Sequence, residues 1–74
     1  MKEVKIKLND IDKVKDFANL TTYKVAGDVD LESGKYVIDG KSIMGIFSLD
    51  LSKPITMRVS DDTDLTPFEK FFVE

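Results

Sequence analysis

The sequence predicts an α+β domain in which one four-stranded antiparallel sheet carries its helices on one face. The 74 residues of the chain suffice for one hydrophobic core. Four short segments alternate apolar and polar residues, as strands with one buried face do. Other segments between and after them carry apolar residues at helical spacing. In chain order the elements are β-α-β-β-α-β-α, and we expect a single domain over residues 1–74.

Two periodicities near the N-terminus predict the first strand and the first helix. Alternation over residues 4–8 indicates a strand with one buried face. Asn9 or Asp10 is placed to cap the N-terminus of the helix that follows. We expect the helix to end near Gly27, where a glycine can adopt the left-handed conformation. The apolar stripe of this helix contains Ile11, Val14, Phe17, Ala18 and Thr21.

A β-hairpin and a short helix are expected in the middle of the chain. Residues 28–32 and 35–39 alternate on either side of a turn that contains Gly34. Ser42 then precedes an apolar run over residues 43–49, so it suits the N-cap of one or two helical turns.

The last strand and the last helix occupy the C-terminal third. Alternation over residues 55–59 predicts the fourth strand, and the acidic residues 61–64 are typical of a solvated loop. A short helix should start near Thr66 and Pro67, since proline is favoured in a first helical turn. Its apolar stripe, expected in the core with Phe72 able to extend an interface, contains Leu65, Phe68, Phe71 and Phe72.

Composition excludes several classes of function. The chain has no histidine and no cysteine, so it lacks the usual zinc ligands, a histidine acid or base, and a thiol nucleophile. We therefore expect no metal site, no cofactor and no enzymatic activity. With 11 Lys and Arg against 14 Asp and Glu, the net charge of −3 also lacks the basic excess of a nucleic-acid binder. A protein partner is the expectation.

The same composition bears on location. The absence of cysteine is consistent with the reducing cytoplasm. Residues 1–7 alternate charged and apolar side chains, which differs from the continuous apolar core of a secretion signal. No stretch reaches the roughly 20 apolar residues of a membrane span. We expect a cytoplasmic protein.

Residues 41–49, K-S-I-M-G-I-F-S-L, resemble the regulatory-serine region of the HPr phosphocarrier family, whose usual form is K-S-I-M-G-V-M-S-L. Seven of the nine positions agree. Residues 28–32 are similar to the family's D-V-N-L-E strand, and the resemblance runs over residues 11–60 without gaps. It implies an open-faced β-sandwich of HPr type and a relation to the bacterial phosphoenolpyruvate-dependent sugar phosphotransferase system.

One motif of the family is missing. HPr proteins begin their first helix with G-I-H-A-R-P-A, in which the histidine accepts a phosphoryl group from enzyme I and the arginine steadies it. The register from Ser42 places Ile11 at the histidine and Lys13 at the arginine. Phosphotransfer of the ordinary kind is therefore not expected. Asp10 and Asp12 flank the position, but carboxylates in the first turn of a helix more simply stabilise its N-terminus.

The resemblance also implies two interaction features. The family's serine at the position of Ser42 is phosphorylated by an ATP-dependent HPr kinase, which makes Ser42 a regulatory candidate; its alternative role is helix capping alone. Ile43, Met44 and Phe47 match the family's hydrophobic docking patch, and their alternative is core filling or packing against a neighbouring copy. Ile46 and Leu49 are the better core residues.

The sequence thus predicts a non-catalytic, HPr-like interaction or regulatory module. The resemblance points to phosphotransferase-system enzymes, HPr kinase or a transcription regulator as partners. One alternative is a phosphotransfer component phosphorylated at Ser42 or at a non-histidine acceptor. Another is a structural, self-associating domain, because fold alone does not define function.

Overall fold

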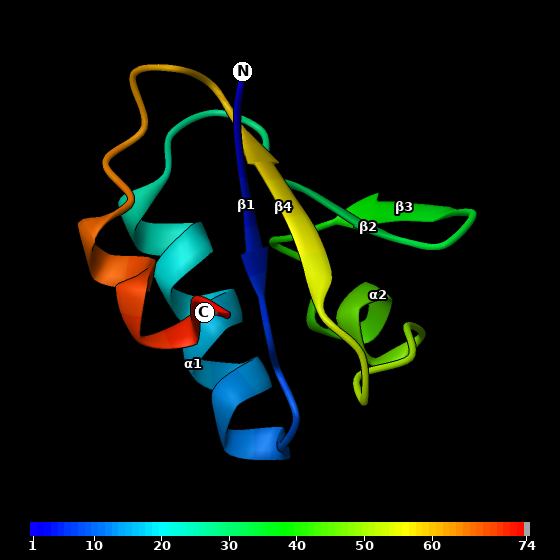
Figure 1. The fold of residues 1–74 in the computed structure, drawn as a ribbon. Coiled ribbons are helices and arrows are strands. Elements are labelled where there is room, and N and C mark those ends of the chain that lie inside the picture. The colour runs from blue at the N-terminus through cyan, green and yellow to red at the C-terminus, as the bar shows by residue number, and fades with distance from the viewer. Residues whose placement is uncertain (74) are drawn as a thin grey trace.

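The computed structural model describes residues 1–73 and has the predicted order of strands and helices. Figure 1 shows their arrangement. The strands are β1 (Lys2–Ile6), β2 (Asp30–Ser33), β3 (Tyr36–Asp39) and β4 (Ile55–Val59). The helices are α1 (Ile11–Lys24), α2 (Ile43–Phe47) and the 3-10 helix η1 (Thr66–Phe71). Helix α1 packs against both α2 and η1, and α2 also packs against β3.

The four strands form one antiparallel sheet in the order β1-β4-β2-β3. The register aligns side chains across all four strands, so each row of the sheet faces one way. One such row is apolar and contains Val4, Met57, Leu31 and Ile38. The next row faces the opposite side and contains Glu3, Arg58, Asp30 and Asp39. The sheet is therefore open, with one apolar face against the helices and one polar face.

The core joins the apolar sheet face to buried side chains of all three helices. Phe17 of α1 is fully buried and lies between two phenylalanines of η1. Its ring centroid is 5.6 Å from that of Phe68 and 5.4 Å from that of Phe71, both in edge-to-face geometry. Such contacts stabilise aromatic clusters beyond the burial of their area. They hold the C-terminal part of the chain against α1.

The N-terminal half of α1 differs from the predicted stripe at one residue. Asp10 caps the helix as expected, and its carboxylate accepts a hydrogen bond of 2.8 Å from the Lys13 N–H. The buried stripe begins at Val14, whereas Ile11 is exposed. Ile11 is the first residue of the helix. It precedes the part of the helix that contacts the core, so its helical spacing from Val14 does not bury it.

The C-terminus of α1 also differs from the prediction. The helix ends at Lys24, and Val25 leaves it in an extended conformation with φ of −117°. Gly27 is not left-handed, because Gly34 in the β2–β3 turn is the one residue of positive φ in the described part of the chain. Val25 is buried in the core. Turning its side chain inward ends the helix without a left-handed glycine.

The last helix starts at Thr66, with Pro67 in its first turn, as predicted. It is a 3-10 helix and not an α-helix. Beyond it, the chain continues along the outer edge of β1. The Lys7 N–H donates to the Phe71 carbonyl at 2.9 Å, and the Val73 N–H donates to the Lys5 carbonyl at 3.0 Å. Phe72 thus forms a bridge with Ile6, and its partly buried side chain packs against the core.

Gly40 lies where β2, β3, α1 and the start of α2 meet. Its N–H donates to the Val29 carbonyl at 2.7 Å, and its carbonyl accepts from the buried Thr21 hydroxyl at 2.8 Å. A Cβ at this position would lie 2.5 Å from Cγ1 of Val29 and 3.3 Å from Cγ of Leu31. Only glycine fits this contact without displacing core side chains.

Gly40→Ala is expected to lower the free energy of unfolding by about 1–3 kcal/mol, because the added methyl group overpacks the core. Gly27→Ala is the matched control, since a Cβ there meets nothing within 4 Å and the backbone φ is not positive. Its unfolding free energy should stay within about 0.5 kcal/mol of the parent or rise slightly. Urea titrations followed by circular dichroism give both values. Equal midpoints for the two variants would contradict the close contact at Gly40.

Candidate functional site

The N-terminus of α1, where the resemblance places a phosphoacceptor, carries no nucleophile in the first position of the helix. Ile11 presents a hydrocarbon side chain to solvent there. The Lys13 ammonium donates to the side-chain carbonyl of Asn9 at 3.0 Å. The carboxylate of Asp10 is occupied in capping, and Asp12 lies in the first turn, where its charge favours the helix. These residues stabilise a helix N-terminus.

The described residues 1–73 do not gather the acidic side chains needed to bind a metal ion beside this helix terminus. An aspartyl phosphoacceptor normally works with such an ion, because the metal neutralises charge on the transferred phosphoryl group. Asp10 and Asp12 therefore have no metal-binding cluster around them in this part of the chain.

Within residues 1–73, no helix has the length and apolar character of a transmembrane segment.

Ser42 caps α2 as predicted. Its hydroxyl oxygen accepts a hydrogen bond of 3.1 Å from the Gly45 N–H, and its backbone is extended, with φ of −100°. The Ile46 N–H then donates to the Ser42 carbonyl at 3.0 Å, which is the first bond of the helix. A Cβ on Gly45 would lie 3.3 Å from the Ser42 hydroxyl oxygen, so glycine leaves room for the cap. The cap fixes where α2 begins.

Helix α2 buries one side and exposes the other. Ile46 is fully buried and Leu49, just beyond the helix, is nearly so, as predicted for these two residues. In contrast, Met44 is 78% exposed, Phe47 41% and Ile43 36%. We call Ile43, Met44 and Phe47 the α2 surface. The five-residue helix has too little core contact to bury all its apolar side chains, so these three meet solvent.

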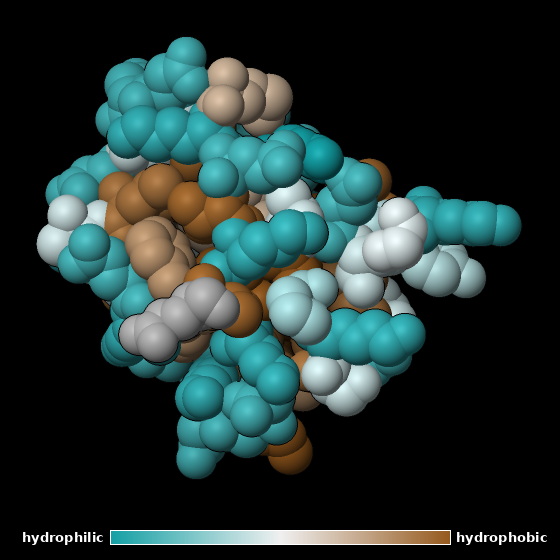
Figure 2. Space-filling view, in the orientation of Figure 1, coloured by the Kyte–Doolittle hydropathy of each residue, from teal (hydrophilic) through white to brown (hydrophobic). Residues whose placement is uncertain are grey.

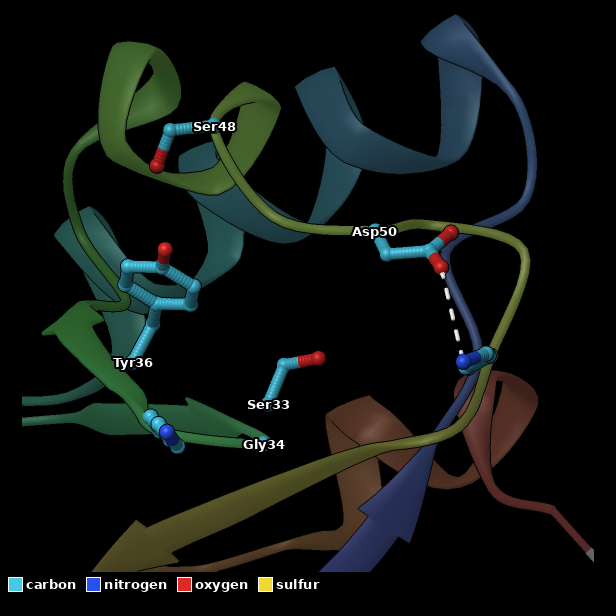
Figure 3. Close-up of a pocket in the computed structure, with 7 residues that line it drawn as sticks. Ser33, Gly34, Tyr36, Ser48 and Asp50 are labelled. Carbon is cyan, nitrogen blue, oxygen red and sulfur yellow. Dashed lines mark ion pairs between the residues drawn. The ribbon is translucent and has the colours of Figure 1, made fainter.

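The two regions singled out by sequence lie at one end of the molecule. Helices α1 and α2 are in contact. Figures 1 and 3 both show the start of α1 at the same end as α2 and the segment that follows it. The fold therefore brings the N-terminus of α1, which lacks the phosphoacceptor, to the same end of the domain as the exposed α2 surface.

A hollow of about 380 Å³, which the sequence did not predict, lies between the β2–β3 turn and the segment after α2. Figure 3 shows Tyr36, Ser33 and Asp50 around the open space below Ser48. Two lysines complete its lining, and the full set is Ser33, Gly34, Lys35, Tyr36, Ser48, Asp50 and Lys53. In the sequence, this hollow corresponds only to two predicted turns. Nothing in those residues indicates that the two turns approach each other in the fold.

Three polar side chains of this hollow, those of Ser48, Asp50 and Lys53, are engaged with their own chain. Hydrogen bonds from the Ser52 hydroxyl and from the Ser52 N–H lower the pKa of the Asp50 carboxyl. Its other oxygen lies 3.9 Å from the Lys53 ammonium. The Ser48 hydroxyl donates to the Gly45 carbonyl at 2.5 Å. These donors stabilise the ionised form of the Asp50 carboxyl. Its role in the structure is therefore to hold the turn at Ser52.

The polar face of the sheet carries an ion-pair network around Arg58. Its Nε donates to Glu3 at 2.9 Å, and its Nη1 donates to Glu32 on the other neighbouring strand. The hydrogen bonds that the Arg58 guanidinium donates to Glu32 and Glu3 raise its pKa. Lys5 donates from its ammonium to the Thr56 hydroxyl at 2.8 Å on the same face. On this face Arg58 is paired with two carboxylates, whereas Asp30 and Asp39 take part in none of the ion pairs within residues 1–73.

We compared the chain with protein-family models, with curated proteins and with solved structures, and none of the three comparisons gave a match. The functional assignment therefore depends on the residues and geometry of this chain.

Ser42→Ala should reduce the free energy of unfolding by about 1 kcal/mol, because it removes the acceptor for the Gly45 N–H. Ser42→Asn retains a side-chain acceptor suited to an N-cap and should stay close to the parent. Denaturant titrations of the three proteins test the cap. Equal loss in both variants would mean that some other property of Ser42 stabilises the fold.

Proposed function

We propose that the chain is an HPr-like, non-catalytic protein-interaction or regulatory module, and that its sheet and helices form an open-faced β-sandwich of HPr type. The β-α-β-β-α-β order of the first six elements and the similarity of residues 41–49 to the family's regulatory-serine region support this assignment. The observation that carries the proposal is the exposure of three apolar side chains on the five-residue helix α2. In this proposal they form the docking surface for a protein partner.

The energetic argument for docking concerns the side chains that are left in water. Exposed apolar surface is unfavourable by about 25 cal/mol per Å² relative to burial, so a cluster on one helix favours any partner that covers it. Met44 and Phe47 also suit recognition, because methionine adapts its shape and aromatic rings bury a large area. Their neighbour Ile46 already fills the core position of the helix. The α2 surface is thus free to bind without disturbing the fold.

The absence of catalysis follows in this proposal from the chemistry of Ile11. A hydrocarbon side chain has no lone pair with which to accept a phosphoryl group. Lys13 donates to Asn9, so its ammonium helps to order the loop before α1. The module would interact through shape and apolar contact, without phosphotransfer from enzyme I.

A second candidate function is regulation by phosphorylation of Ser42. Its hydroxyl oxygen serves the cap as an acceptor, so the hydroxyl proton is not required for the bond from Gly45. Ser42 is only partly buried, and Ile43 and Met44, the next two residues, are exposed. A phosphoryl group here would add negative charge directly before α2 and beside the α2 surface. In this candidate function the modification would alter partner binding.

Met44→Asp and Phe47→Asp should each weaken binding to the partner by about tenfold or more, since each puts a charge into an apolar contact. The test uses the purified partners that the resemblance indicates, enzyme I and HPr kinase, captured on immobilised protein. Tyr23→Asp is the control, because Tyr23 is an exposed aromatic residue of α1 outside the α2 surface. The thermal midpoints should stay close to the parent, as all three side chains are exposed. Capture unchanged by both α2 substitutions would overturn the docking role.

Incubation with phosphoenolpyruvate and enzyme I should add no acid-labile phosphoryl group, because Ile11 cannot accept one. Intact-mass measurement before and after mild acid treatment reads this directly. Incubation with ATP and HPr kinase tests the second candidate function: an acid-stable phosphoryl group that is absent from Ser42→Ala would support it. Stoichiometric acid-labile labelling by enzyme I would refute the non-catalytic assignment.

A further inference from the structure

Strand β3 is an outer strand of the sheet, and the backbone groups of two of its residues point away from the molecule. The Gly40 N–H donates to the Val29 carbonyl, so these two residues form a hydrogen-bonded pair at the end of the β2–β3 ladder. Hydrogen-bonded pairs alternate along an antiparallel ladder. Val37 and Asp39 are therefore the residues whose backbone N–H and C=O groups face outward.

The other edge of the sheet is formed by β1, and the chain itself covers part of it. The C-terminal segment covers β1 at Lys5 and Lys7 through two backbone hydrogen bonds. In residues 1–73, no strand pairs with the outer edge of β3. Two intrachain bonds lie at the end of this edge: the Ser42 N–H donates to the Asp39 carbonyl at 3.1 Å, and the Lys41 N–H donates to the Asp39 carboxylate at 2.9 Å. An unpaired edge with free N–H and C=O groups is a template for another strand.

The side chains of β3 also suit a partner strand. Val37 is 58% exposed, although it is a β-branched apolar residue on the otherwise polar face of the sheet. Tyr36 is 71% exposed on the opposite face, beside the hollow near α2. Neither contributes to the core. Both residue types are favoured in paired strands, where they pack against cross-strand neighbours.

We propose that two copies of this chain associate through antiparallel pairing of their β3 strands, with the two-fold axis passing beside Val37. In this register Val37 of one copy pairs with Val37 of the second copy, and the two exchange both backbone hydrogen bonds. Tyr36 lies opposite Ile38 of the second copy. Lys35, in the turn just before β3, comes near Asp39 of the second copy, and the same contact is repeated on the other side of the axis.

Charge complementarity favours this register and favours a second copy of the chain as the binding partner. Lys35 is the turn residue directly before β3 and Asp39 is the last residue of the strand, so a two-fold axis at Val37 brings each lysine near the aspartate of the other copy. Within one chain, Asp39 lies opposite Asp30, and like charges directly opposite each other are unfavourable. The ion pairs formed in residues 1–73 involve neither Lys35 nor Asp39. The second copy supplies the missing counter-charges.

The interface is small, because β3 has only four residues. Contacts of this size give weak, transient association. The chain should therefore be monomeric when dilute and should dimerise at concentrations of roughly 0.1–1 mM. This surface shares no residue with the α2 surface, so the inference goes beyond the proposed function and can fail or hold independently of it.

Sedimentation equilibrium tests the association through the weight-average mass, which should rise from 8.4 kDa towards twice that value with concentration. Lys35→Glu alone and Asp39→Lys alone each place like charges opposite one another twice, so each variant should remain monomeric. An equimolar mixture of the two variants restores opposite charges at both contacts and should dimerise. Met44→Asp is the control for association through α2 and should dimerise as the parent does.

Amide hydrogen exchange supplies a second readout that does not depend on the substitutions. The Val37 and Asp39 N–H groups should gain protection as the concentration of the parent rises, whereas those of Tyr36 and Ile38 should not change. A parent chain that stays monomeric at about 1 mM would overturn the proposal. So would dimerisation that both charge substitutions leave intact, or that Met44→Asp abolishes.

Discussion

The contact at Gly40 is the constraint on which the arrangement of this domain depends. Its N–H closes the β2–β3 ladder, its carbonyl holds Thr21 of α1, and its missing side chain lets Val29 and Leu31 come close. Ser42, the residue that starts α2, follows two positions later. The direction in which α2 leaves the sheet is therefore set by a backbone contact, and with it which apolar side chains of α2 meet the core.

The four strands and the two α-helices could be predicted from the sequence, because their periodicity reports directly which side chains face the core. Val4 and Ile6 in β1, and Ile55, Met57 and Val59 in β4, follow the alternation of a one-sided sheet. The Ser42 cap was also predictable, because a serine before an apolar run has a local hydrogen-bonding role. Both the alternation and the cap depend only on residues that are close together in the sequence.

Features that depend on how distant segments meet were not predictable. The exposure of Ile11 reflects how far the core extends along α1, which helical spacing does not encode. The end of α1 is decided by burial of Val25 in place of a left-handed glycine. Likewise, the hollow beside Tyr36 exists only because the β2–β3 turn approaches the segment after α2.

The C-terminal segment that lies along β1 has a consequence for how large an assembly of this chain can become. A sheet with two open edges can add strands at both ends and grow without limit, which is the geometry of a fibre. Here Phe71 and Val73 occupy the edge of β1 at Lys7 and Lys5, so growth at that side is blocked there by the chain itself. In the proposed dimer, contact through the remaining edge uses the same strand from both copies and consumes it. Association of that kind would therefore stop at a pair of chains.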